Sequence, residues 1–187
     1  MAHALHIFKL MLTARRPSQV LDMHAVSIPF WLHEGYDALT FFGHIVTNSE
    51  KEAERYNSLK PQTSNLRSAL PLATAGTQEI QTSTWYHPVK FHETIHLRQA
   101  QSTHDSWLCF YWKYMLFWFQ ARRANRILPN AGYLLNPFEM EAYANMYNPR
   151  YLDRFAEEEG AATGWCEYAK MTLAQRFWAR RKYSRRK

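Results

Sequence analysis

The segment from Phe91 to His96, with the sequence FHETIH, holds the residues best suited to catalysis. His92 and His96 are about one helical turn apart, so on a helix both imidazoles lie on one face and can bind one metal ion. Glu93 is turned away from that axis and could take a proton from a water on the metal. This H-E-x-x-H pattern indicates a zinc site used for hydrolysis. By itself it also fits a surface histidine pair beside a solvated glutamate, so a third ligand must decide.

Candidates for the third ligand lie between Asn136 and Tyr143, in the sequence NPFEMEAY. Catalytic zinc sites usually hold three protein ligands and leave the fourth position to water, so a carboxylate on a returning helix would complete the set. With Asn136 as helix N-cap, Glu139 occupies the third helical position, where a glutamate can instead stabilise the helix start. In that case Glu141 would be the ligand. The residues alone leave three alternatives open: Glu139, Glu141 or no carboxylate.

The pattern H-E-x-x-H over 92–96, followed by E-x-E-A over 139–142, resembles the gluzincin metallopeptidases whose third ligand is the first glutamate of an E-x-x-A-D motif. Tyr143 stands where that motif has aspartate. The chain from 41 to 147 is also similar to small zincin-like proteins of bacteria and their phages, some encoded among virion genes. The resemblance implies a compact zincin fold, one zinc ion per chain and Glu93 as general base. It also implies the ligand set His92, His96 and Glu139.

Further polar residues could support such a site. Ligand histidines need hydrogen-bond partners that hold their tautomer, and sequence position suggests three such residues. They are Glu141, Gln99 and Asn145. A peptidase also needs a donor for the oxyanion, although each available residue could equally belong to the core or to a cap. These are Tyr143, Tyr133 and His104. Gln99 and Ser102 stand where the metzincin class requires Gly and His, which excludes that class.

Helix start signals recur in the second half of the chain. Pro88, Pro137 and Pro149 suit the first helical position, and Asn136 and Asn148 precede two of them as N-caps, so helices should begin near these prolines. An aromatic helix should cover 105–126, and a last helix should cover 162–181.

The first half should supply the sheet. Residues 38–46 (ALTFFGHIV) predict a strand, whose edge could bind a peptide, and 57–84 predict an exposed loop. With 187 residues, 47% of them hydrophobic, the chain can bury one core. We therefore expect one mostly helical α+β domain over 1–187. It comprises a strand and loop part over 1–85, metal-site helices over 86–148, and C-terminal helices with a basic tail over 149–187.

Large aromatic and apolar residues recur at steps of three and four along the 105–126 helix, which predicts a core face packed on the back of the metal-bearing helix. They are Trp107, Phe110, Tyr111, Tyr114, Met115, Trp118 and Phe119. The alternative is an interfacial membrane role. Lys113 interrupts this apolar stretch, which is also too short for a transmembrane span.

The basic residues gather at the C-terminal end. Residues 176–187 carry seven Lys and Arg and no acid, which equals the whole formal net charge of +7. Such a tail could bind nucleic acid, anionic lipid or an acidic protein, or simply be a solvated helix end. The candidate contacts are Arg180, Arg181, Lys182, Arg185, Arg186 and Lys187.

Two cysteines, Cys109 and Cys166, cannot form a multi-bridge framework, so we expect free thiols in a reducing compartment. No secretory signal is evident, so we expect a cytoplasmic or virion-associated protein. The first functional hypothesis is a zinc metallopeptidase acting on a peptide or protein. The alternative is a non-catalytic zincin-fold component of a larger assembly, such as a phage virion, whose tail docks a partner.

Overall fold

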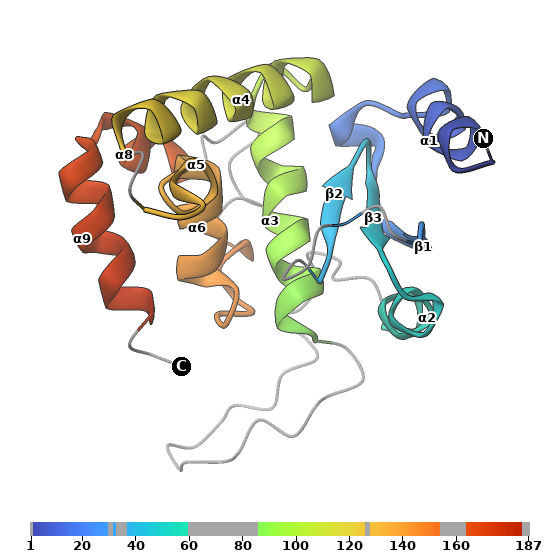
Figure 1. Ribbon diagram of the computed structural model, residues 1–187. Helices are drawn as coiled ribbons and strands as arrows, with labels where there is room; N and C mark the ends of the chain where they lie inside the picture. Colours follow the sequence, from blue (N-terminus) through green and yellow to red (C-terminus); the bar gives the residue numbers. More distant parts are fainter. Residues whose placement is uncertain are drawn as a thin grey trace, which may run out of the picture.

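The computed structural model describes residues 2–29, 32, 37–59, 86–125, 128–153 and 164–184. Over these residues the fold is α+β and mostly helical, as expected, with one small three-stranded sheet near the N-terminus. The sheet lies on one side of a central helix, α3 (Pro88–Ser102), and most of the other helices lie on the opposite side (Figure 1). All but the first residues of the predicted 57–84 loop fall outside the described residues.

The sheet contains β1 (His24–Ser27), β2 (Leu39–Phe41) and β3 (His44–Thr47) in the order β1-β3-β2. β1 pairs with β3 in parallel, and β2 pairs with β3 antiparallel. The single strand predicted over 38–46 is therefore wrong, because these residues form a hairpin. Phe42 and Gly43 have φ values of 48° and 85°, as in the two-residue turn that suits the twist of paired strands.

Two helices in the first half were not predicted. α1 (Ala2–Leu12) precedes the short 3₁₀ helix η1 (Pro17–Gln19), and α2 (Glu50–Ser58) follows β3. α2 packs against β1 and β3 and buries Ala53 and Tyr56. Its start carries a local signal, since Ser49 precedes two acidic residues that favour a helix N-terminus.

Two of the predicted helix starts are confirmed. α3 begins at Pro88, where the side chain of His87 accepts a hydrogen bond from the backbone N–H of Val89. α6 (Pro137–Asn145) begins at Pro137 and is capped by Asn136, and the short α5 (Ala131–Leu134) precedes it. The backbone from 149 to 152 forms turns, and 154–163 lie outside the described residues.

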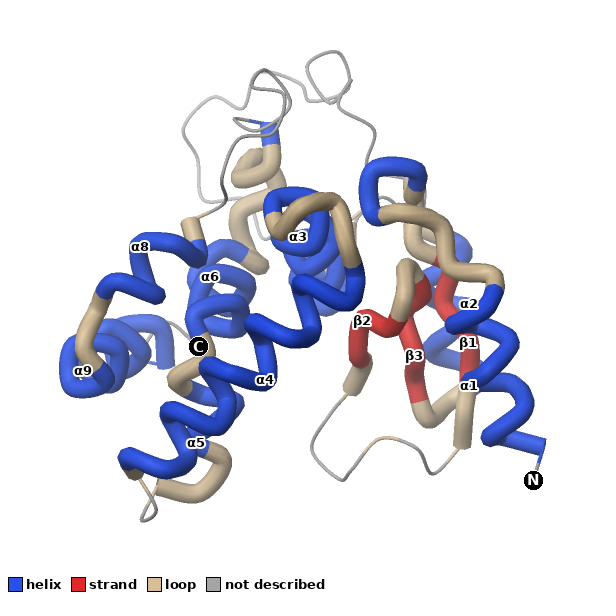
Figure 2. Tube along the Cα trace, turned by 90° about the horizontal axis from the view of Figure 1, so that it is seen from above, coloured by secondary structure: helices blue, strands red, loops and turns tan. Residues whose placement is uncertain are grey.

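The aromatic helix is α4 (Trp107–Ala124), which crosses one end of α3 (Figures 1 and 2). Its core face is confirmed in part: Trp107 and Phe110 are buried, whereas Met115 and Phe119 are exposed. α4 also carries exposed apolar residues on its other side, including Leu108 and Trp112, so periodicity alone cannot tell which side meets the core. No helix in the described ranges is long and apolar enough to cross a membrane.

The single C-terminal helix predicted over 162–181 is wrong, because two helices replace it: α8 (Trp165–Lys170) and α9 (Leu173–Ser184). Between them Thr172 Oγ1 accepts a hydrogen bond from the N–H of Gln175, and Gln175 Oε1 accepts one from the N–H of Thr172. This reciprocal cap starts a new helix at Thr172. Cys109 in α4 and Cys166 in α8 are free thiols, as expected.

The contact between α4 and α5 depends on Gly132. A Cβ at this position would lie 2.7 Å from Cδ1 and Nε1 of the Trp118 indole. We expect Gly132→Ala to lower the free energy of unfolding by about 1–3 kcal/mol, because the indole must shift within a packed interface. Urea unfolding measures this loss. In the Trp118→Leu background the same substitution should cost clearly less, and an equal cost in both backgrounds would contradict the assigned contact.

Candidate metal centre

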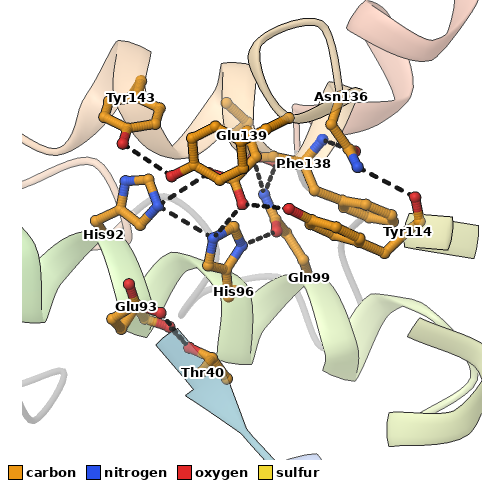
Figure 3. A network of polar contacts seen from close by, with 12 residues as sticks. Thr40, His92, Glu93, His96, Gln99, Tyr114, Asn136, Phe138, Glu139 and Tyr143 are labelled. Atoms are coloured by element: carbon orange, nitrogen blue, oxygen red, sulfur yellow. Dashed lines mark hydrogen bonds and ion pairs between the residues drawn. The ribbon is translucent and has the colours of Figure 1, made fainter. Parts of the chain in front are cut away.

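Three side chains that the sequence singled out as metal ligands converge between α3 and α6 (Figure 3). His92 and His96 extend from α3, and Glu139 extends from the first turn of α6. The two histidine Nε2 atoms are 3.1 Å apart, and they lie 3.2 Å and 3.4 Å from the Glu139 carboxylate oxygens. Each of the three residues is at most 5% exposed. The structure therefore forms a buried group that could hold a metal ion.

The spacing of these atoms fits a tetrahedral metal. Ligand bonds of about 2.0–2.1 Å in a zinc tetrahedron separate the ligand atoms by about 3.3 Å. The two Nε2 atoms are about this far apart, and each lies at about this distance from one oxygen of Glu139, Oε2 for His92 and Oε1 for His96. Within the described part of the chain, Oε2 of Glu139 accepts no hydrogen bond although it is buried. Two imidazoles and one carboxylate are donors that suit zinc and related transition metals. Elsewhere in the described ranges no other group of three or more metal-binding side chains comes together.

The carboxylate of Glu139 and the imidazole of His96 favour each other's charged forms. Burial acts to lower the pKa of His96, but the charge of Glu139 and its hydrogen bond raise that pKa to about 9. For Glu139, burial acts to raise the pKa, and the two histidines outweigh it and hold the pKa well below its usual value. A bound cation would take the place of the proton on His96, because a ligand histidine must be neutral.

Gln99 holds His96 in the tautomer that metal binding needs. The Nδ1 of His96 lies 2.7 Å from Oε1 of Gln99, so Nδ1 donates to Gln99 and Nε2, which faces Glu139, is the nitrogen left to bind a metal once its proton is lost. The Gln99 amide in turn donates to the carbonyl of Phe138 and to Oε2 of Glu141, both at 2.9 Å. The contact with His96 thus supports the role that the sequence predicted for Gln99.

We expect Gln99→Met to weaken zinc binding by about 10–100-fold, because it removes the acceptor that orients His96 while keeping a similar volume. Competition against a chromophoric chelator measures the dissociation constant. Gln101→Met is the matched control, since Gln101 lies on the same helix and donates to the carbonyl of Pro17, away from the site. Equal affinities for Gln99→Met and wild type would contradict the role of Gln99.

Glu141, the other candidate ligand, points away from the histidines. Its carboxylate accepts four hydrogen bonds and is fully buried. The donors are the Gln99 amide, the Tyr151 hydroxyl and the backbone N–H groups of Gly164 and Trp165. Glu141 therefore ties the start of α8 to α3. Asn145 donates to the backbone carbonyl of Glu141 rather than to a histidine of the group.

Glu93, the predicted base, lies on the sheet side of α3. Its Oε2 accepts a 2.6 Å hydrogen bond from the hydroxyl of Thr40 in the edge strand β2 (Figure 3). The outer edge of that strand is partly covered, because the Tyr111 hydroxyl donates to the carbonyl of Thr40 and accepts from the N–H of Phe42. A peptide that pairs with β2 would have to displace Tyr111.

Tyrosines surround the metal-binding group. Tyr114 donates to Oε1 of Glu139 at 2.9 Å, a role that the sequence analysis missed because Tyr114 looked like an ordinary core position of α4. The ring of Tyr143 packs against His92 with centroids 4.6 Å apart, and its hydroxyl lies 2.8 Å from that of Tyr133. His104, the third predicted oxyanion donor, is exposed in the turn after α3 and lies away from this group.

The basic residues of the C-terminal segment do not all lie in a solvated tail. Arg180 in α9 lies over the ring of Tyr143, 4.1 Å from its centroid, so it borders the metal-binding group. Arg181 lies over the ring of Trp178 on the same helix. The side chain of Lys182 and residues 185–187 lie outside the described part, so their predicted contacts stay predictions.

No protein-family model, curated protein or solved structure matches the chain. Function is therefore inferred from the residues and geometry of the buried group.

Proposed function

We propose that this chain is a zinc-dependent hydrolase of peptide bonds. One observation carries the proposal: the described site offers three converging donors rather than four. Three protein ligands are typical of catalytic zinc sites, whereas structural sites are closed by four. Glu93 directly follows His92 on α3 and supplies a carboxylate that could act as a base. A purely structural site has no need of such a base.

Each residue of the site has a distinct role in the proposed reaction. Zinc held by His92, His96 and Glu139 would acidify a water and polarise the substrate carbonyl. Glu93 accepts the proton of the attacking water and passes it to the leaving amine, and the hydrogen bond from Thr40 orients its carboxylate.

The Tyr133 and Tyr143 hydroxyls, which lie 2.8 Å from each other, are the candidates for an oxyanion donor. Burial raises the pKa of both phenols, so both stay protonated at neutral pH and can donate a hydrogen bond.

The test is metal-dependent cleavage of a quenched fluorescent peptide library. The purified chain is stripped with a chelator and then reloaded with one equivalent of zinc. We expect cleavage that disappears on stripping and returns on reloading. A chain that binds zinc but cleaves no peptide in the library would overturn the proposal.

A second candidate is a non-catalytic zincin-fold component of a larger assembly, such as a virion. The burial of all three ligands and the cover of His92 by Tyr143 favour it, because a substrate needs access to the metal. In that case zinc would raise the melting temperature without any hydrolysis, and the basic C-terminal segment would dock a partner.

A further inference from the structure

α4 carries large apolar side chains on its outer face as well as on its core face. The exposed residues recur at steps of three and four and are between 42% and 71% exposed. They are Leu108, Trp112, Met115, Leu116 and Phe119. A helix that is apolar all round normally has both faces covered, and a continuous exposed apolar stripe marks an interaction surface. We call these five residues the outer face of α4.

Positive charge accompanies this face and negative charge is missing from it. α4 contains no acidic residue, and Arg122 and Arg123 are exposed in its last turn. Both arginines line a cavity of about 740 Å³ together with Trp118 and Phe119. The guanidinium of Arg122 lies 5.4 Å from the centroid of the Trp118 ring. The end of the outer face is thus a cationic hollow beside aromatic rings, a setting that suits a phosphate group.

α1 repeats this character on the same side of the molecule, along the upper edge of Figure 1. It also contains no acidic residue, and Lys9 on the helix and Arg15 and Arg16 just after it are exposed. Its exposed apolar residues are Leu5, Phe8, Met11 and Leu12. α1 and α4 therefore both expose apolar residues, and the charged residues within both helices are all basic.

We propose that the outer face of α4, together with α1, binds the surface of an anionic phospholipid bilayer. α4 lies in the plane of the interface, its Trp112 and Leu116 enter the acyl boundary, and Arg122 and Arg123 meet the phosphates. Aromatic and aliphatic side chains accompanied by cations are typical of interfacial helices. A second copy of the chain fits less well, because apposed α4 helices would bring like charges together.

The binding is peripheral, because the opposite face of α4 is held in the core through Trp107 and Phe110. The proposal does not depend on zinc or on hydrolysis. It can therefore fail while the proposed function stands, and the reverse also holds.

The test is flotation of the full chain with vesicles of phosphatidylcholine and phosphatidylglycerol in equal amounts, against vesicles of phosphatidylcholine alone. We expect binding to the anionic vesicles that weakens as salt is raised. The double variant Trp112→Gln with Leu116→Gln should reduce the partition coefficient by at least about tenfold, because two apolar side chains no longer enter the bilayer. Arg122→Gln and Arg123→Gln should each reduce it by about fivefold.

Trp178→Gln is the matched control for the apolar face, since Trp178 is a comparably exposed tryptophan on α9, 60% against 68% for Trp112. Lys51→Gln, at an exposed position of α2, is the control for charge. Both controls should bind like wild type. Circular dichroism checks that each variant is folded, as expected for substitutions at exposed positions.

Three outcomes would overturn the proposal. The first is no binding to anionic vesicles, and the second is an equal loss in Trp178→Gln. The third is a dimer in light scattering that the Trp112→Gln, Leu116→Gln variant dissociates while vesicle binding is unchanged, which would assign the outer face to a second copy.

Discussion

We expect Glu139→Gln to abolish stoichiometric zinc binding, whereas Glu141→Gln should leave zinc bound and destabilise the fold. This opposite outcome is expected because the two glutamates lie on one helix but face different partners. Glu139 meets both histidines, and Glu141 accepts four hydrogen bonds from other groups. If three ligands share a binding free energy on the order of 10–16 kcal/mol, loss of one costs about 4 kcal/mol, or a thousandfold in affinity.

For Glu141→Gln we expect the free energy of unfolding to fall by about 3 kcal/mol or more, because an amide nitrogen would face backbone N–H donors and charge-assisted hydrogen bonds would be lost. Zinc content after dialysis, by atomic emission, and urea unfolding of the same samples measure the two effects. A folded Glu141→Gln chain without zinc beside a Glu139→Gln chain with one zinc would contradict the ligand set.

The second large effect concerns Glu93. In the zinc-loaded chain, Glu93→Gln should lower kcat/KM for a cleaved peptide by about 10²–10⁴-fold, because an amide cannot accept the proton. Zinc content should not change, since Glu93 lies outside the three-donor group. The glutamine can still accept the hydrogen bond from Thr40, so the local structure should persist.

Thr40→Val provides the graded control. It keeps the carboxylate but removes the hydroxyl that orients it, so we expect a smaller loss of about tenfold, with zinc still bound. Activity of Glu93→Gln equal to that of wild type would show that another group is the base. Zinc-loaded wild type without any peptidase activity would favour the assembly component instead.

Local signals in the sequence predicted much of the second half of the molecule. The starts of α3 and α6 follow from Pro88, Pro137 and the cap Asn136, whose effects act within one helical turn. The pairing of His92 with His96 follows from helical spacing alone. The single strand over 38–46 and the single helix over 162–181 were wrong, although the turn at Gly43 and the cap at Thr172 that divide them are also local features.

Other features could not be predicted from local rules. The choice between Glu139 and Glu141 as the neighbour of the histidines depends on how α6 rotates against α3, which long-range packing determines. The contact of Tyr114 with Glu139 depends on the crossing of α4 over α3 in the same way.

The sequence by itself determined which chemical groups are available: two imidazoles one turn apart, a neighbouring carboxylate, a nearby pair of glutamates, and an apolar helix without acids. Only the tertiary structure decided which glutamate completes the group, which hydrogen bonds orient it, and which face of α4 stays exposed. The physical reason is that periodicity places residues around the axis of one helix. Which of these faces is buried depends on packing against side chains from distant segments, and no single segment contains that information.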